Sequence, residues 1–89
     1  MDLKYEEGRI YAENDNGELV AEITYSVSGG IANIDHTFVD ASLRGQGMAS
    51  KLVKAAADQI QKEGKQITAS CWYAAGWLKD HPEYTIVKS

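Results

Sequence analysis

The 89-residue sequence predicts an α+β domain: a mixed, mainly antiparallel sheet of four or five strands with one long central helix and a short second helix. Three observations support this. Runs in the first half alternate apolar and polar residues, which is typical of half-buried strands. Short glycine- and asparagine-rich turns separate these runs, which favours antiparallel pairing. A later run carries apolar residues at helical spacing. We expect residues 1–89 to form one domain, because this length leaves no room for a second core.

Three strands are expected before the long helix. The first covers residues 8–12 and leads into Asn14-Asp15-Asn16-Gly17, a strong hairpin signal. Residues 19–27 alternate between apolar and polar side chains and form the second strand. Gly29-Gly30 makes the next tight turn, and residues 31–39 form the third strand. Together these segments predict an antiparallel meander.

The long helix is expected to follow a loop over residues 40–46. It runs from about residue 47 to residue 63, and Gly64 is well placed to cap its C-terminal end. Residues 65–71 are expected to form a short fourth strand. A strand–helix–strand connection of this length favours a parallel, right-handed crossover, so this strand should lie beside the third.

A short second helix is expected over residues 74–80, where the following Pro82 stops it. Residues 83–87 read as a final extended segment. An exposed sheet edge on so small a domain could pair with another copy, so we expect a monomer or a weak homodimer.

Composition narrows the classes of function. Thirteen acidic residues against nine basic ones give a net charge of -4, which disfavours sequence-independent binding to nucleic acid. The single cysteine excludes an internal disulfide and a multi-cysteine zinc site, and we expect no metal site. The N-terminus has no apolar signal core and no run reaches membrane-spanning length, so we expect a cytoplasmic protein without a membrane partner.

The most informative segment is Arg44-Gly45-Gln46-Gly47-Met48-Ala49, between the third strand and the long helix. Glycines there let the backbone approach a ligand, and the first helix amides point outward at the positive end of the helix dipole. The dipole disfavours Arg44 at this end unless an anion lies between the guanidinium and the amides. A purely turn-shaping role would explain one glycine. The motif of phosphate-binding loops and the dinucleotide fingerprint both fail to match. The predicted occupant is a phosphate group.

The same six residues resemble the Arg/Gln-x-x-Gly-x-Gly/Ala signature of the GNAT N-acetyltransferase superfamily. The order of strand, loop, signature, helix and parallel strand agrees with that family. More narrowly, Asp35-His36-Thr37, Cys71-x-Tyr73 and His81-Pro82-Glu83-Tyr84 resemble its compact YjdJ-type members. The resemblance implies a minimal GNAT-like fold in which two parallel strands splay apart and admit the pantetheine arm of acetyl-CoA.

The resemblance also implies the reaction and the cofactor site. It implies transfer of an acetyl group from acetyl-CoA (coenzyme A) to a primary amine, on a small molecule or on a protein lysine. The signature would bind the pyrophosphate. The cofactor-binding residues expected on this basis are Phe38, Val39, Arg44, Gly45, Gln46, Gly47, Met48, Ala49 and Tyr73.

His36 is the residue that the resemblance offers as general base. An imidazole with an unperturbed pKa of about 6.5 suits that role. On a regular strand it shares a face with Ile34 and Phe38 and should point towards the interior or the cleft. The alternative is a partly buried structural histidine. Asp35 faces the other way on such a strand, which favours a solvent or cross-strand partner for it.

Cys71 closes the fourth strand, where the parallel topology could bring it close to His36. Its thiolate could accept the acetyl group covalently, or its thiol could protonate the CoA sulfur. The alternative is a small hydrophobe. Tyr73 stands where the family's acid tyrosine is expected. Trp72 and Trp77 could cover pantetheine or adenine, although packing beneath the second helix is the favoured interpretation.

A second class of function remains open. Larger GNAT members usually build one wall of the acceptor site from N-terminal helices, which are lacking here, and their C-terminal strands are nearly absent from this sequence. We therefore expect a shallow or open acceptor pocket. The rival hypothesis is therefore a non-catalytic acyl-CoA-binding or protein-interaction module. His81, before a proline at a helix end, is expected to be exposed.

Overall fold

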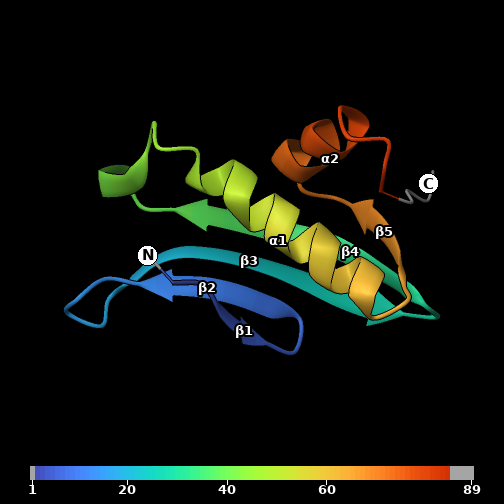
Figure 1. Ribbon diagram of the computed structural model, residues 1–89, viewed down its shortest axis with the longest axis horizontal. Coiled ribbons are helices and arrows are strands. Elements are labelled where there is room, and N and C mark those ends of the chain that lie inside the picture. The colour runs from blue at the N-terminus through green and yellow to red at the C-terminus, as the bar shows by residue number, and fades with distance from the viewer. Residues whose placement is uncertain (1, 85–89) are drawn as a thin grey trace.

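A computed structural model describes residues 2–84 and contains one five-stranded sheet crossed by a long helix (Figure 1). The strands follow each other across the sheet in chain order, and a second, shorter helix lies beside the first. The elements are β1 (Lys4–Glu6), β2 (Arg9–Glu13), β3 (Leu19–Ser28), β4 (Ile31–Val39), the 3-10 turn η1 (Ala41–Leu43), α1 (Met48–Lys62), β5 (Gln66–Ala69) and α2 (Trp72–Lys79).

The predicted fold class is confirmed, as are the three-stranded meander, the long helix and the parallel pairing of β5 with β4. The strand β1 was not expected from the sequence; it pairs antiparallel with β2 across a turn at Gly8. All three β1 residues are exposed, so no buried face left an alternating pattern. Residues 85–87 of the expected final segment lie outside the described residues.

The core lies between α1 and the sheet. Its largest fully buried side chains come from both layers, and each is worth about 1.5–3 kcal/mol relative to full exposure. No polar side chain is buried among the described residues. This packing fixes the start of α1 relative to β4. The largest fully buried side chains are Ile10, Ile23, Ile34, Leu52, Val53, Ile60, Ile67 and Leu78.

Gly64 ends α1 as predicted. It takes a left-handed φ of +75°, and its N–H donates to the carbonyl of Gln61 at 2.9 Å. The N–H of Lys65 reaches back to the carbonyl of Ile60 at 3.1 Å. These two bonds form the glycine C-cap that satisfies the last helix carbonyls and turns the chain into β5.

A β-bulge interrupts the pairing of β3 with β4. Tyr25 lies opposite Ile34, but Thr24 lies opposite His36, so Asp35 is an extra residue on β4. The Asp35 carboxylate accepts hydrogen bonds from the hydroxyls of Thr24 (2.6 Å) and Ser26 (2.9 Å). These contacts confirm the expected cross-strand role of Asp35.

The bulge corrects the predicted direction of His36. Because one residue is added, the alternation changes phase after Ile34. Ile34 is buried on the α1 side, and Thr37 and Val39 continue that face because they lie opposite the buried Ile23 and Ala21. His36 and Phe38 therefore point to the open face of the sheet, away from the helices, and both are exposed.

β4 and β5 part beyond a short ladder. They pair only between Ile31 and Ile34 on β4 and Gln66 and Ala69 on β5. At the end of this ladder the Ile34 carbonyl accepts the N–H groups of both Ser70 (3.0 Å) and Cys71 (3.2 Å). In the part of the chain that the structure describes, no strand lies beside residues 35–39 on this side. The predicted separation of the two parallel strands is thus present, and the open edge of β4 faces the start of α2.

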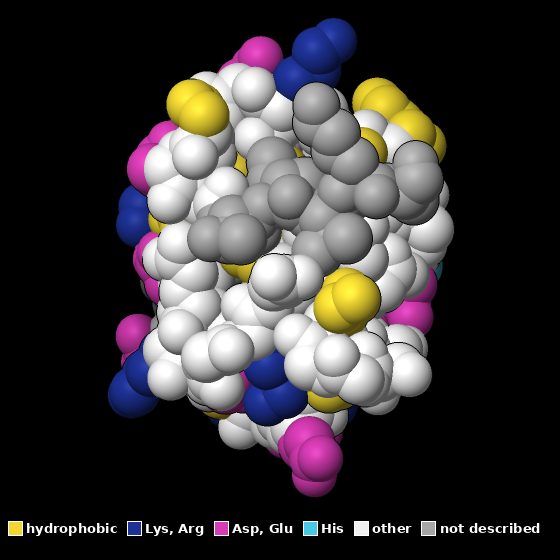
Figure 2. All heavy atoms as spheres, turned by 90° about the vertical axis from the view of Figure 1, so that its right-hand side faces the viewer, with side chains coloured by type: hydrophobic (Ala, Val, Ile, Leu, Met, Phe, Trp, Pro, Cys, Tyr) yellow, Lys and Arg dark blue, Asp and Glu magenta, His cyan; other side chains and the backbone are white. Residues whose placement is uncertain are grey.

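The surface at the β5 end of the molecule mixes all types of side chain (Figure 2). Basic and acidic side chains are scattered around this face, and the hydrophobic ones occur singly or in small groups.

Within residues 2–84, none of the helices combines the length and the apolar character that crossing a membrane requires.

Candidate functional site

The loop that leads from β4 into α1 is fixed at its entry by Asp40. This residue caps η1, and its carboxylate accepts the Ser42 N–H at 3.0 Å and the Ser42 hydroxyl at 2.6 Å. These hydrogen bonds lower the pKa of Asp40 below its ordinary value. The Asp40 N–H in turn donates to the carbonyl of Val20 on β3 at 2.7 Å. The loop therefore leaves the sheet from a defined position.

Two left-handed glycines then shape the start of α1. Gly45 has a φ of +83° and Gly47, the N-cap residue, has a φ of +72°. A Cβ atom at either glycine would meet no atom within 4 Å, so packing does not demand glycine there, but the backbone conformation does. No side chain caps the helix, and its first turn carries no acidic residue. The first amides of α1 therefore have no side-chain cap.

A pocket of about 340 Å³ lies directly over this helix start. It is formed by the end of β4, the η1 loop, the first residues of α1 and one residue of α2, and no carboxylate lines it. Its lining residues are Val39, Leu43, Arg44, Gly45, Gly47, Met48, Ala49 and Tyr73.

The pocket brings together most of the residues predicted to bind the cofactor and leaves out two. Phe38 points to the opposite face of the sheet because of the bulge. Gln46 is exposed and its side-chain amide donates to the carbonyl of Ser42 at 3.4 Å. Leu43 lines the pocket but was not predicted; an apolar residue within an otherwise polar loop was the available signal.

The chemistry of this lining fits a phosphate group with an apolar extension. Arg44 is an exposed cation beside free helix amides, at the positive end of the α1 dipole. Val39, Leu43 and Met48 supply apolar surface on the side towards β4. Arg44 at a helix start is unfavourable in an empty pocket, and an anion between it and the amides removes the conflict.

Cys71 lies at the start of α2, where the edges of β4 and α2 meet. It is half-buried, and its sulfur lies 3.6 Å from the Thr37 hydroxyl oxygen. Burial raises the pKa of the thiol, but the amides of Ala74 and Tyr73 and the Thr37 hydroxyl together outweigh burial and lower it. A lower pKa increases the thiolate fraction at a given pH.

The expected approach of His36 to Cys71 is corrected by the structure. The β4 residue that reaches the sulfur is Thr37, one position later, because the bulge turns His36 to the other face. Sequence reasoning missed Thr37 for the same reason. His36 lies across from Thr24 on the open face, next to the point where β4 and β5 separate.

The two tryptophans of α2 differ in their surroundings. Trp77 packs as favoured: its indole N–H donates to the Ser50 hydroxyl at 2.9 Å, and its ring stacks on His81 with centroids 3.7 Å apart. His81 is consequently half-buried rather than exposed as expected. Trp72 does not pack beneath the helix, because 85% of its surface is exposed. Tyr73, at right angles to Trp72, is half-buried.

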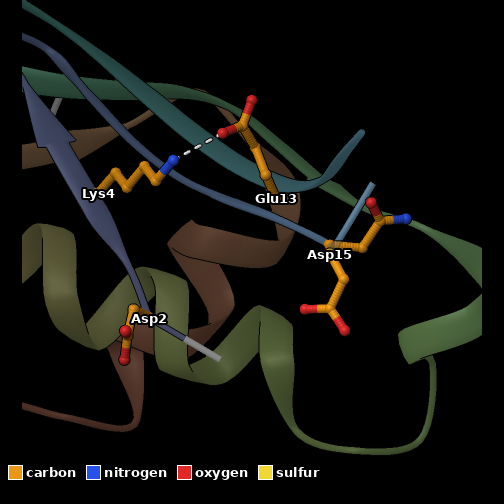
Figure 3. A pocket seen from close by; sticks show the side chains of 5 residues that line it. Asp2, Lys4, Glu13 and Asp15 are labelled. Atoms are coloured by element: carbon orange, nitrogen blue, oxygen red, sulfur yellow. Dashed lines mark hydrogen bonds and ion pairs between the residues drawn. The ribbon is translucent and has the colours of Figure 1, made fainter. Parts of the chain in front are cut away.

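A second hollow near the N-terminus carries acidic residues but does not form a metal site. It measures about 530 Å³ and lies between β1 and the β2–β3 turn. Lys4 forms an ion pair with Glu13 at 2.7 Å, and the carboxylates of Asp2 and Asp15 lie apart from each other and from this pair (Figure 3). Within residues 2–84, no group of three metal-binding side chains converges. This hollow shares no lining residue with the pocket at the start of α1.

Known proteins resemble this chain in sequence and in fold. The family model described as GCN5-related N-acetyl-transferase matches residues 9–87. The NMR solution structure of a GCN5-like protein from Staphylococcus aureus is 34% identical, with a TM-score of 0.75 over 98% of this chain and 90% of that one. A CoA complex of the Escherichia coli GNAT protein YhbS is 23% identical; it has a TM-score of 0.63 over 76% of this chain and 44% of that one, and shows likeness of fold.

Curated relatives share the name NATD1. The human protein is 36% identical over 52 residues, which cover 58% of this chain and 46% of the relative. The zebrafish (Danio rerio) protein is 31% identical over 78 residues, which cover 85% of this chain and 68% of the relative. For most of these relatives, this chain spans about half of their length.

Proposed function

The chain belongs to the GCN5-related N-acetyltransferase family, and on this premise we propose that it transfers an acetyl group from acetyl-CoA to a primary amine. The observation that carries the proposal is the pocket at the start of α1. There Arg44, the left-handed Gly45 and Gly47 and the uncapped amides of α1 meet apolar surface that leads towards β4. The acceptor is either a small molecule or a protein lysine.

Arg44 and the amides at the start of α1 would hold the diphosphate of acetyl-CoA. The open edge of β4 beyond Ile34 would accept the pantetheine arm, because its backbone groups have no strand partner on that side in the described chain. When bound, acetyl-CoA supplies the acetyl group as a thioester. This placement brings the end of the arm between β4 and the start of α2, where Cys71 and Tyr73 lie.

In direct transfer, a new bond forms between the amine nitrogen and the acetyl carbon while the carbon–sulfur bond breaks. His36 would take the proton that the amine loses, because the imidazole is exposed on the open face where an acceptor can arrive. The Cys71 thiol or the Tyr73 hydroxyl would give a proton to the departing sulfur. The amine and the thioester would then meet from opposite sides of β4.

In the covalent route, the Cys71 thiolate would attack the acetyl carbon and release the CoA sulfur, which takes its proton from Tyr73. The amine would then take the acetyl group from Cys71 and give its proton to the Tyr73 phenolate that the first step leaves, and the thiolate would be restored. The lowered pKa of Cys71 favours this route, since the thiolate is the nucleophile.

Calorimetric titration with acetyl-CoA tests the binding step, and intact-mass spectrometry tests the chemistry. We expect saturable binding that Arg44→Ala combined with Gly47→Asp abolishes. We also expect an acetyl adduct that Cys71→Ser removes, and turnover of a competent amine that His36→Ala slows. Absence of acetyl-CoA binding to the wild-type chain would falsify the proposal. Unchanged turnover in Cys71→Ser would remove Cys71 from the mechanism while leaving transfer itself in place.

A non-catalytic acyl-CoA-binding or interaction module is the second candidate. The observation that favours it is the open face around His36 and Phe38, which no other described segment covers. This candidate predicts binding of acetyl-CoA without turnover on a broad panel of amines and peptides, and no effect of His36→Ala.

We also propose that the protein works in the cytoplasm as a monomer or weak homodimer, without nucleic acid or membrane. The net charge of -4 and the free thiol of Cys71, which suits a reducing compartment, support this. The three-residue edge strand β1 offers little backbone for pairing with a second copy. Sedimentation of the purified chain across a concentration series checks the assembly state.

A further inference from the structure

The outer side of α2 carries a groove that neither the fold nor the proposed acetyl transfer requires. It measures about 300 Å³ and is lined by Trp72, Tyr73, Gly76, Trp77 and Asp80. Trp72, Gly76 and Asp80 are spaced four residues apart, so they lie along one side of the helix. Tyr73 borders both this groove and the pocket at the start of α1.

Two of these residues have no structural explanation within the described chain. Trp72 is 85% exposed, more than any other large apolar side chain that the structure describes. An exposed tryptophan of this kind is a ready contact for a ligand. Gly76 lies inside α2, although glycine is a poor helix former. A Cβ at Gly76 would meet no atom within 4 Å, so close packing does not require glycine. Its missing side chain keeps the middle of the groove open.

One wall of the groove is held in place, and one end of the groove is negative. Trp77 is held by its hydrogen bond to Ser50 and by the stacked ring of His81. Asp80 is exposed and forms the C-cap of α2, where its carboxylate adds to the negative end of the helix dipole. A carboxylate is unfavourable at that position, and a bound cation removes the conflict.

We propose that this groove binds a small organic ammonium ion, with the charge at Asp80 and the alkyl chain across Gly76 between the tryptophan rings. Aromatic faces and a carboxylate together attract a cation and repel an anion, and the net charge of -4 acts in the same direction.

The binding test needs no acetyl-CoA. The full chain, with its tryptophans ¹⁵N-labelled, is titrated with 1,4-diaminobutane, and the two indole N–H signals are followed by NMR. We expect saturable shifts of the Trp72 signal, at least fivefold weaker binding in Asp80→Asn and Trp72→Ala, and loss of binding in Gly76→Gln. Asp15→Asn and Ala75→Gln are the matched controls, because both residues are exposed and lie outside the groove; both should bind as the wild-type chain does.

Three results would overturn the proposal. They are equal binding by all variants, equal shifts with uncharged 1,4-butanediol, and displacement of the diamine by 3′,5′-ADP, which would make the groove a nucleotide site. A lysine-containing tripeptide in place of the diamine distinguishes a protein source of the ammonium group from a free amine. Diamine binding without any binding of acetyl-CoA would refute the proposed acetyl transfer and leave this groove standing.

Discussion

The hydroxyl oxygen of Thr37 lies 3.6 Å from the sulfur of Cys71 and links the open edge of β4 to the first turn of α2. This contact is one of those that lower the pKa of Cys71. Thr37→Val keeps the shape but removes the hydroxyl, so we expect the pKa of Cys71 to rise and alkylation by iodoacetamide at neutral pH to slow. The pH dependence of the alkylation rate measures the shift. Thr68→Val, on β5, is the control and should leave the midpoint unchanged.

Gly47 offers a test of the anion pocket that separates strain from binding. Gly47 and Gly64 have nearly equal left-handed φ values of +72° and +75°, and both have open space where a Cβ would lie. Alanine at either position should therefore reduce the free energy of unfolding in urea by about 1 kcal/mol. Only Gly47→Ala should also weaken acetyl-CoA binding, because Gly64 lies at the other end of α1. Equal acetyl-CoA affinities in the two variants would exclude a role for Gly47 in binding.

Arg44 should contribute to ligand affinity without contributing to stability. It is exposed, and no ion pair involving it occurs among the described residues. Arg44→Ala should weaken acetyl-CoA binding by about tenfold, since a charge-assisted contact to phosphate is lost. Without ligand the unfolding midpoint should not fall, because the arginine lies at the positive end of the helix dipole. Calorimetry at two salt concentrations measures the loss of affinity, and the difference should shrink at high salt. Lys51→Ala, a charge change one turn further along α1, should retain most of the affinity.

Tyr25 makes stability depend on alkaline pH. Burial, followed by the nearby Glu63 carboxylate that accepts its hydroxyl, raises the pKa of Tyr25 to about 12. The unfolded chain releases this proton near pH 10, so the contribution is complete below about pH 10 and is lost as pH rises towards 12. Urea unfolding between pH 8 and 12 should show a decline on the order of 2 kcal/mol from this group. Tyr25→Phe should flatten the decline, whereas Tyr5→Phe, at an exposed tyrosine, should retain it.

Local patterns predicted the elements well where one face is buried. The apolar residues of the alternating β3 and of the α1 stripe are the ones buried in the core, so the pattern predicts the element. Gly64 ends the helix because glycine readily adopts the left-handed backbone conformation found there. β1 escaped prediction because its three residues are exposed and owe their pairing to β2 alone. The parallel position of β5 followed from the length of the crossover.

The conformation of the signature residues could be predicted from the sequence, but the direction of the side chains on β4 could not. The conformation of residues 44–49 is set by the left-handed Gly45 and Gly47, so it could be predicted from the sequence. The direction of His36 depends on the bulge, and the bulge depends on Thr24 and Ser26 of β3 holding the Asp35 carboxylate. Such a cross-strand bond has no local pattern, and one extra residue exchanges the faces of all that follow.

The bulge at Asp35 also suggests how such a domain can change its chemistry over evolutionary time. Loss of the bulge without a change in length would restore regular alternation, turning His36 towards the thiol and Thr37 to the open face. The hydrogen bonds that Thr24 and Ser26 donate to Asp35 thus select which of two sets of side chains meets an incoming acceptor.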